Sequence, residues 1–441
     1  MKGILELNKK ELFDLTEKLN RMHEVDLAHF MEELDTEEVL FISRLIKKEQ
    51  LSEAIAELGT DYKQAMIEHL SDSELETVIQ HLDSFELAET MREVPANIVK
   101  RLIRHIDDNR RPLINQVLGY PEESVGSIMG VELVKCYEND TLETMIEKVK
   151  TAQFDAEYLQ VIWVVNHSQQ LQGFINVADL LRYQDQPLSE LIKYDVISIN
   201  TLADQEEAAK FMNKYHLAVL PVIDEEGCLV GVISTETVLD VIEEEFSEDI
   251  AQMQGMANID EGYLEESTYS HFLKRIKWLL ILMITATMTG YIIQKYDDIL
   301  STSVVLAAYI PMLMDSGGNA GGQATTVIIR SLTLGELDSK DILKIVWKEL
   351  RIALMVGLTL AIINVIRIGM MDHVSLMVNL TVSLSLMCTI VMAKLVGAVL
   401  PFIGLFFKQD PVVMAGPLIT TIVDTFALII YFEIASLLLG I

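Results

Sequence analysis

The sequence predicts a multi-domain membrane protein, with a cytosolic α-helical superhelix and a pair of α/β modules followed by a five-helix transmembrane domain. Three observations predict this class: an apolar residue that recurs every twelve positions, a strand–turn–strand–helix pattern that occurs twice, and five apolar stretches in the last part of the 441-residue chain. The predicted domains are 1–123 for the superhelix, 124–183 and 184–243 for the two modules, 244–270 for an acidic connecting helix, and 271–441 for the transmembrane part.

The twelve-residue repeat runs from about residue 20 to residue 120. Four of its units open with a similar polar segment, such as E-L-D-T-E-E or H-L-S-D-S-E, which offers Asp, Ser or Thr as a helix N-cap. Helical repeats of this kind bury their apolar faces on their neighbours. We expect a scaffold with a solvated acidic surface and no catalytic cluster. The repeated positions are Leu34, Ile46, Leu58, Leu70, Leu82, Val94 and Ile106.

The two α/β modules each begin with a strand-like segment, Tyr158 to Val165 in the first and Ala218 to Ile223 in the second. A polar turn, a second strand and a helix follow in both. The pair resembles two CBS modules, and the segment L-P-V-I-D-E-E-G-C-L-V-G-V-I-S carries the resemblance most specifically.

CBS pairs often bind adenosine nucleotides through a Gly-hydrophobic-x-Thr/Ser-x-x-Asp/Asn pattern. In the first copy Asn176 stands at the hydroxyl position before Asp179, and in the second copy Ser234 is followed by Thr237 at the acid position. Both copies depart from the pattern, so the sequence leaves nucleotide binding open.

A helix predicted between Asp240 and Met256 carries an unusual density of acids. Like charges three and four positions apart destabilise a helix. A divalent cation that bridges this helix to Asp224, Glu225 and Glu226 would offset the repulsion, and a solvated acidic face is the alternative. The crowded acids are Asp240, Glu243, Glu244, Glu245, Glu248 and Asp249.

The charge of the chain is divided unevenly. Residues 269–441 hold 12 basic and 11 acidic side chains and carry +1, so the preceding residues carry −33 and the whole chain −32. This acidity argues against a nucleic acid partner and favours solvation or cation binding. The three cysteines have no metal-ligand spacing, so we expect reduced structural thiols.

The apolar stretches are expected to cross the bilayer near 276–294, 302–328, 350–370, 375–403 and 411–439. Basic residues precede the first span and fill the loop after the second, which places both in the cytoplasm. Five crossings then leave the C-terminus outside. The basic side chains are His271, Lys274, Arg275 and Lys277, then Arg330, Lys340, Lys344, Lys348 and Arg351.

Two of these spans contain an acid. The motif P-M-L-M-D-S-G-G-N-A-G-G-Q-A places Asp315 and Asn319 on one helical face, with Gly318 and Gly322 beside them, and the last span contains Asp424. Acids at bilayer depth usually face a bundle interior or a water-filled path, and glycines at this spacing let two backbones approach. Two spans with one acid each predict a cation path.

Prolines are expected to interrupt these helices at Pro311, Pro401 and Gly416-Pro417, where freed carbonyl groups can serve as oxygen ligands. The alternative is purely structural. In it the glycines only pack helices, Asp315 caps one, and Lys394 or Arg367 neutralises Asp424.

The order of domains, together with G-G-N-A-G-G-Q and D-P-V-V-M-A-G-P-L-I-T-T-I-V-D, resembles the MgtE magnesium transporters over essentially the full length. The resemblance implies a homodimeric Mg²⁺ channel in the cell membrane, which closes when its cytosolic domains bind Mg²⁺. It implies that Asp424 holds hydrated Mg²⁺, and that the pore also includes Asp315, Gly318, Asn319, Ala415, Pro417, Thr420 and Thr421. Regulatory Mg²⁺ would be held by Asp224, Glu225, Glu226, Glu236, Asp240, Glu243, Glu244, Glu248 and Asp249.

The expected partners are therefore the lipid bilayer, a second copy of the chain, and Mg²⁺ with other divalent cations. One alternative is a CBS-regulated carrier that couples Mg²⁺ or Co²⁺ to Na⁺ or H⁺, and voltage-dependent current would separate it from a channel. Another is a membrane-anchored sensor without transport. No enzymatic activity is expected, because the sequence contains no nucleophile–base pairing or phosphate loop.

Overall fold

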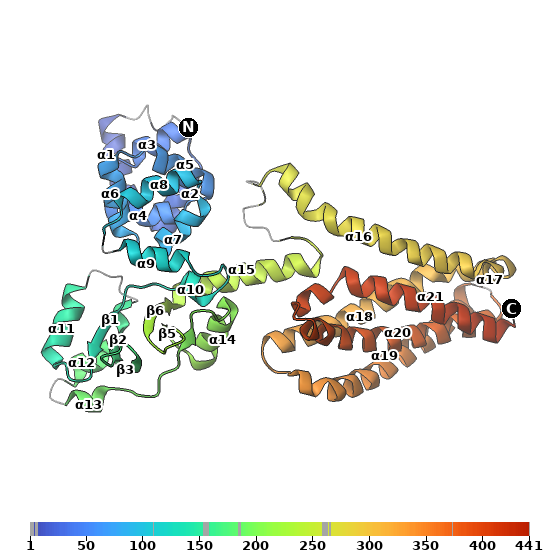
Figure 1. Ribbon diagram of the computed structural model, residues 1–441. Coiled ribbons are helices and arrows are strands. Elements are labelled where there is room, and N and C mark those ends of the chain that lie inside the picture. The colour runs from blue at the N-terminus through green and yellow to red at the C-terminus, as the bar shows by residue number, and fades with distance from the viewer. Residues whose placement is uncertain are drawn as a thin grey trace. The chain divides into compact units, whose positions relative to one another are not determined.

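The structure is a computed structural model that describes residues 4, 8–108, 110–152, 158–183, 187–257, 263, 266–372 and 374–440. It contains two compact units, Met1–Glu243 and Glu244–Ile441 (Figure 1). The first holds the helical repeats and both α/β modules, and the second holds the long apolar helices.

The helical repeats pack alternately, with α2 on α4, α4 on α6 and α6 on α8. Each helix therefore buries one face on the next unit but one, as a helical superhelix requires. The helices are α1 (Lys9–Leu19), α2 (Glu24–Glu32), α3 (Thr36–Ile42), α4 (Lys48–Ala56), α5 (Thr60–His69), α6 (Asp72–His81), α7 (Ser84–Glu93), α8 (Ala96–His105), α9 (Arg111–Leu118) and α10 (Val125–Ile128).

The repeated apolar residue ends four of the helices. Leu70, Leu82, Val94 and Ile106 are the C-cap residues of α5 to α8 and have extended backbone. They are only 3 to 5% exposed. In these units the repeated position is therefore the residue at which a helix ends. Its side chain packs in the core before the next helix begins.

The predicted N-caps are partly confirmed. Ser71 and Asp83 each accept a hydrogen bond from the backbone N–H three residues later and form capping boxes at α6 and α7. Gly59, not Thr60, is the N-cap of α5, so the prediction of a threonine cap there is wrong.

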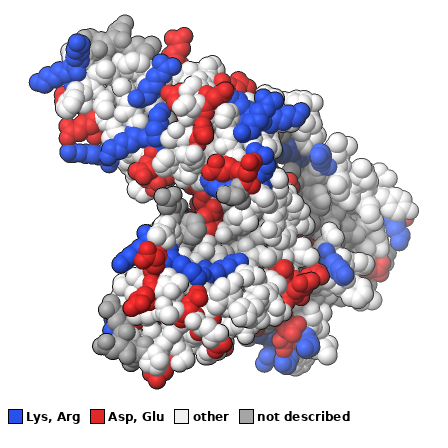
Figure 2. Space-filling view, turned by 60° about the vertical axis from the view of Figure 1, so that its left-hand side comes forward, with Lys and Arg blue, Asp and Glu red and all other residues white. Residues whose placement is uncertain are grey.

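Acidic and basic side chains are interspersed on the face of the first unit that Figure 2 shows. Ion pairs join helices of this unit, including Lys63 with Glu93 and Arg101 with Asp72. Lys63 is 4% exposed, whereas the Glu93 side chain is 34% exposed, so only the lysine end of this pair is shielded from water.

Each α/β module contains a three-stranded sheet whose first two strands are parallel and whose last two are antiparallel. Bridges between Gly130 and Val232 and between Gln170 and Cys228 join the two modules into one pair. The elements are β1 (Val134–Tyr137), α11 (Leu142–Thr151), β2 (Val161–Val165), β3 (Leu171–Asn176), α12 (Val177–Arg182), α13 (Leu188–Leu191), β4 (Ile199–Asn200), α14 (Gln205–Tyr215), β5 (Val219–Ile223) and β6 (Leu229–Ser234).

The acidic connecting helix is the later part of α15 (Thr235–Met253), which begins directly after β6 and continues as one helix of 19 residues. Before the next helix, Glu266 accepts a 2.8 Å hydrogen bond from Lys274 Nζ and pairs with His271. These contacts attach the end of the connection to the first turns of α16 (Thr268–Lys295).

In the second unit α18 packs against both α20 and α21, while α19 packs against α20 and α16 against α21. The helix that carries the polar motif is therefore in contact with two apolar neighbours. After α16, the elements are α17 (Asp297–Thr302), η3 (Val304–Tyr309), α18 (Ile310–Thr333), η4 (Ser339–Asp341), α19 (Ile342–Met371), α20 (Leu376–Phe406), η5 (Pro411–Met414) and α21 (Pro417–Leu439).

Among the described residues, four helical segments are long and apolar enough to cross a membrane: Thr268–Lys295, Ser339–Met371, Leu376–Phe406 and Pro411–Leu439. The expected span at 302–328 is not among them. In its place the chain forms the end of α17, then η3 and α18, and the polar residues of α18 lower its hydropathy.

The prolines have different roles. Pro311 lies in the first turn of α18, where its missing N–H costs nothing, and Gly416, with φ 47°, separates η5 from α21. The interruption predicted at Pro401 is wrong, because α20 continues through it. Pro401 cannot donate to the carbonyl of Gly397, and Thr325 Oγ1 of α18 lies 3.0 Å from that oxygen and donates in its place.

Candidate functional site

Asp315 and Asn319 lie on one face of α18, as their spacing predicts. Asn319 Nδ2 donates a 3.1 Å hydrogen bond to Asp315 Oδ1, which orders both side chains. Both are exposed in the isolated chain.

The first turn of α21 presents oxygen atoms near this face. Thr420 Oγ1 and Thr421 Oγ1 donate to the Pro417 carbonyl over 2.9 and 2.8 Å, so each hydroxyl oxygen keeps its acceptor capacity. Asp424 follows one turn later and is half-buried. Ala415, just before the break at Gly416, is 4% exposed.

α18 and α21 meet at a glycine. A Cβ atom on Gly318 would lie 3.3 Å from Thr420 Cγ2, so a larger residue would push the helices apart. Asp315 and Asp424 lie one turn beyond this contact, and their carboxylates are close enough to interact electrostatically. The structure thus places the two acids that the sequence singled out on neighbouring helices, α18 and α21.

The two cations considered as neutralising partners of Asp424 contact other acids. Arg367 donates to Asn364 Oδ1 over 3.0 and 3.2 Å and lies 3.8 Å from Asp372. Lys394 Nζ lies 4.0 Å from Glu349 Oε2. The geometry therefore does not support the structural alternative in which either one neutralises Asp424.

The closest helix contacts of α18 involve glycines other than the predicted ones. A Cβ on Gly321 would lie 3.2 Å from the Ala393 carbonyl of α20, whereas a Cβ on Gly322 would have no neighbour within 4 Å among the described residues. The prediction that Gly322 lets two backbones touch is wrong, because a rotation of about 100° per residue separates its face from that of Gly321.

A cavity of about 1100 Å³ adjoins the Gly318–Thr420 contact. Four predicted residues line it, Gly318, Asn319, Pro417 and Thr420, whereas Asp315, Asp424, Thr421 and Ala415 do not. Sequence reasoning did not place the other polar lining groups at this site, although Lys394 was considered as a partner of Asp424. The signal in the sequence for one of them is Lys394, a lysine inside an apolar span. They are Gln254, Gln323, Thr326, Glu349 and Lys394.

The acids expected to hold regulatory ions are not clustered within the described part of the chain, where no three His, Cys, Asp or Glu side chains could share a metal ion. Asp224 Oδ1 accepts hydrogen bonds from the N–H groups of Glu226 and Cys228 and so stabilises the turn before β6. Glu248 accepts a hydrogen bond from Gln252 one turn later. A cation bridge at these acids stays a prediction.

Glu57, which the sequence did not single out, faces the region of Glu236. The pKa of the Glu57 carboxyl is raised, first by partial desolvation and further by the Glu236 carboxylate, while Lys63 acts to lower it. The Glu236 carboxylate is therefore near enough to disfavour the charged form of Glu57.

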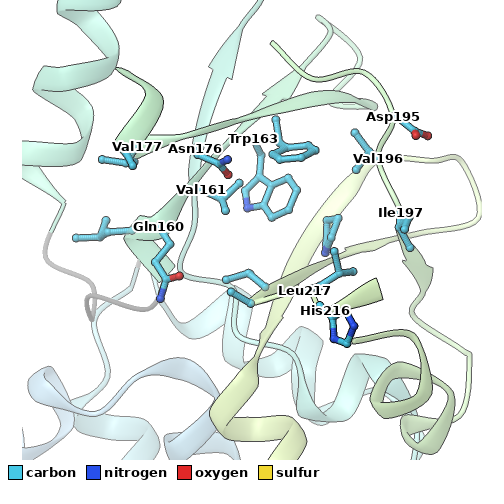
Figure 3. Close-up of a pocket in the computed structure, with 16 residues that line it drawn as sticks. Gln160, Val161, Trp163, Asn176, Val177, Asp195, Val196, Ile197, His216 and Leu217 are labelled. Carbon is cyan, nitrogen blue, oxygen red and sulfur yellow. The ribbon is translucent and has the colours of Figure 1, made fainter. Parts of the chain in front are cut away.

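A second cavity, of about 670 Å³, lies in the α/β pair (Figure 3). The Trp163 indole lies in its middle, and the ring of Phe174 is 6.1 Å away, centroid to centroid. Asn176, Asp195 and His216 contribute polar groups to its lining. The pocket therefore combines an aromatic surface with a carboxylate.

Of the four positions in the sequence pattern for nucleotides, only Asn176 lines this pocket. Asp179 pairs with Lys193 Nζ over 3.0 Å, and this hydrogen bond is the main reason its pKa is lowered. Ser234 and Thr237 are buried, and their hydroxyls lie 3.1 Å apart in a mutual hydrogen bond. The pattern positions of the second copy are thus satisfied within the fold.

Comparison with family models divides the chain in the same order as the sequence. Residues 310–434 match MgtE, a divalent cation transporter; residues 22–123 match the MgtE intracellular N domain; and residues 125–186 and 188–244 match CBS domains.

Curated relatives match over nearly the whole length. The magnesium transporter MgtE of Thermus thermophilus is 33% identical over 430 residues, which is 96% of this chain and 95% of the relative. That of Bacillus subtilis is 25% identical over 438 residues, covering 98% and 96%.

Among solved structures, the cytosolic domain of the Mg²⁺ channel MgtE in complex with ATP is similar to this chain, with a TM-score of 0.50 and 29% identity, over 53% of this chain and 96% of that one. Domain order, membrane motif and full-length identity agree, and the chain belongs to the MgtE family of magnesium transporters.

Proposed function

We propose that this protein is a Mg²⁺ channel whose pore acid is Asp424. The observation that carries the proposal is the meeting of α18 and α21, where Asp315, Asn319, Thr420 and Asp424 gather beside a cavity of about 1100 Å³. Oxygen ligands of this kind suit a hard cation, and acids at this depth are costly unless they serve an ion.

Coordination chemistry explains how such a site passes Mg²⁺. The ion sheds its water reluctantly and prefers one or two carboxylates with several waters. Asp424 from each of two subunits would hold hydrated Mg²⁺ by charge, with Asn319 and the Thr420 hydroxyl as hydrogen-bond partners of its waters. The backbone oxygens around Thr420 add acceptors, so selection does not need a rigid cage.

The proposed topology has five membrane crossings. One of them is α18, although its hydropathy does not identify it as a membrane span. The polar face of α18 would line the path and its apolar face would pack on α20. The N-terminal unit then lies in the cytoplasm and the C-terminus outside. A homodimer would shield the exposed Asp315 and Asn319 from lipid.

Regulation follows from the acidity of the N-terminal part. Bound Mg²⁺ would cancel repulsion among acids such as those of α15, and between Glu57 and Glu236, and so favour a closed arrangement. Without the ion, repulsion favours the open one. Because Mg²⁺ binds the closed state more tightly, Mg²⁺ uptake falls as internal Mg²⁺ rises.

The cavity in the α/β pair suits an adenosine nucleotide. An adenine ring would lie against Trp163 and Phe174, and the Asp195 carboxylate can accept hydrogen bonds from ribose hydroxyls. The similar cytosolic domain was solved in complex with ATP. The nucleotide would act as a second regulator.

The test of conduction is Mg²⁺ flux into liposomes with internal Mg²⁺ varied. Asp424→Asn should abolish most of the flux, whereas Glu433→Gln, on the same helix and bonded to Tyr296 Oη, should retain it. Equal flux in Asp424→Asn and wild type would refute the assignment, and electrogenic current without a Na⁺ or H⁺ gradient would exclude a coupled carrier.

The test of the nucleotide pocket is quenching of tryptophan fluorescence by ATP in the full-length protein. Asp195→Ala should weaken ATP binding about tenfold, the order expected for loss of a charge-assisted hydrogen bond. The exposed Glu190→Gln serves as the control, because Glu190 does not line the pocket. Unchanged affinity in Asp195→Ala would count against the ribose contact.

A further inference from the structure

The cavity beside the Gly318–Thr420 contact has two charged side chains among the lining residues that the structure describes, Glu349 of α19 and Lys394 of α20. Their charges cancel. The acids of the proposed pore, Asp315 and Asp424, lie outside this lining. A permeating Mg²⁺ ion would therefore pass from an acidic site into a compartment with no net charge.

The backbone of α20 holds Lys394 in place. The neighbouring Ala393 carbonyl lies against Gly321 of α18, and one turn later Gly397 contacts the same glycine. Residues this small bring the two helices into close contact on both sides of Lys394 in the chain. The Lys394 side chain is only 7% exposed, and that of Glu349 is 12% exposed.

The pair is incompletely satisfied. The Lys394 ammonium nitrogen lies 4.0 Å from Glu349 Oε2, and this oxygen is inaccessible and has no hydrogen-bond partner within the described residues. Buried ion pairs with poor geometry contribute little to stability, and apolar replacements are often neutral. Stability alone therefore does not account for two opposite charges at the wall of this cavity.

We propose that Lys394 is a specificity-determining residue of the ion path, because its ammonium group serves as the permanent counter-ion of Glu349. It keeps the cavity from becoming a second divalent-cation site in series with Asp424. Mg²⁺ then passes through without being held, and cations that bind carboxylates directly find no ligand. The inference rests on the proposed function, since it assumes that ions cross this cavity.

The consequence is sharpest for Mn²⁺, because carboxylate, carbonyl and water ligands suit this ion. Mg²⁺ dehydrates reluctantly by comparison. If the ammonium group is removed, the Glu349 carboxylate is left unpaired in a partly desolvated cavity. It should then bind Mn²⁺ and block the passage of Mg²⁺.

The experiment measures Mn²⁺ block of Mg²⁺ flux through full-length protein in liposomes. Lys394→Gln should lower the half-blocking Mn²⁺ concentration about tenfold or more, as expected for an uncompensated unit charge a few ångströms from the ion. The neutral pair Glu349→Gln/Lys394→Gln should return to the wild-type value. This reversal separates charge from packing, because both variants lack the lysine.

Lys394→His covers the case in which Lys394→Gln does not fold, since its imidazole carries a charge at pH 5.5 and loses it at pH 8. In Lys394→His the enhanced Mn²⁺ block should appear only at the higher pH. In wild type the fraction of Mg²⁺ flux that Mn²⁺ blocks should be the same at both pH values. The proposal is overturned if Lys394→Gln and Lys394→His are blocked at the wild-type Mn²⁺ concentration.

A measurement without transport separates this inference from the proposed function. Electron paramagnetic resonance of Mn²⁺ with detergent-solubilised protein should count one additional bound ion per chain in Lys394→Gln, and none in the double variant. If wild type shows no flux that depends on Asp424, conduction is wrong, yet this count still decides whether Lys394 masks a cation site.

Discussion

Gly397→Ala tests the contact that positions the ion-binding face of α18. An added Cβ at residue 397 would collide with the Gly321 carbonyl oxygen and lie 2.9 Å from Thr325 Oγ1. The first of these atoms belongs to a helical backbone and cannot rotate away. Overpacking of this kind costs about 1–3 kcal/mol, whereas alanine gains about 0.5–1 kcal/mol over glycine inside a helix.

The net loss is about 0–2.5 kcal/mol, or a fall in the melting temperature of up to about 10 °C for a unit of about 150–250 residues. Gly322→Ala on α18 and Gly290→Ala on α16 are matched controls, because neither added Cβ would have a neighbour within 4 Å. Both should melt at or slightly above the wild-type temperature. The assay is thermal unfolding in detergent followed by size-exclusion chromatography, and a Gly397→Ala protein as stable as Gly322→Ala would refute the contact.

Three further outcomes are expected. Thr325→Val should destabilise the bundle by about 1 kcal/mol, since the Gly397 carbonyl next to Pro401 loses its donor; thermal unfolding measures this, and no loss would mean another group replaces the hydroxyl. The hydrogen bond from Lys274 lowers the pKa of Glu266 from its ordinary 4.5, so its contribution is present above pH 4.5 and disappears as the pH falls through the lowered value; the hydrogen-exchange protection of residues 266–274, relative to the intrinsic rate at each pH, should then fall. The acids of the connecting helix should carry the response to internal Mg²⁺, so their joint replacement by Ala should make flux independent of internal Mg²⁺. An unchanged response would mean that they form only a solvated acidic face. These acids are Glu243, Glu244, Glu245, Glu248 and Asp249.

Periodicity and composition were enough to predict most of the architecture. A repeat of twelve residues identified the helical scaffold, because each unit must bury the same position. The α/β modules were found from alternating apolar runs and polar turns. The predicted interruption at Pro401 failed because a side chain of another helix, Thr325, satisfies the carbonyl that proline leaves without a donor.

The candidate site was predicted as a set of residue types and not as an arrangement. Asp315, Asn319 and Asp424 stood out because charge and amide groups are rare in apolar spans. The choice of Gly318 and Gly322 as close-contact residues failed for Gly322, since spacing defines a helical face but not the neighbour that the face meets. The Glu349–Lys394 pair was invisible for the same reason, as its members are 45 positions apart.

The sequence by itself determined the order of the domains, the polar face of α18 and the presence of an acid in the last span, because these depend on local chemistry and on the cost of polarity in lipid. Tertiary structure alone decided which cationic side chain pairs with which acid. Lys394, Arg367 and Asp424 all lie in apolar surroundings, and only the packing of α18 to α21 assigns Lys394 to Glu349 and Arg367 to Asp372. Coulomb interactions decay over a few ångströms in protein, so a partner is set by distance in space, which a linear chain does not record.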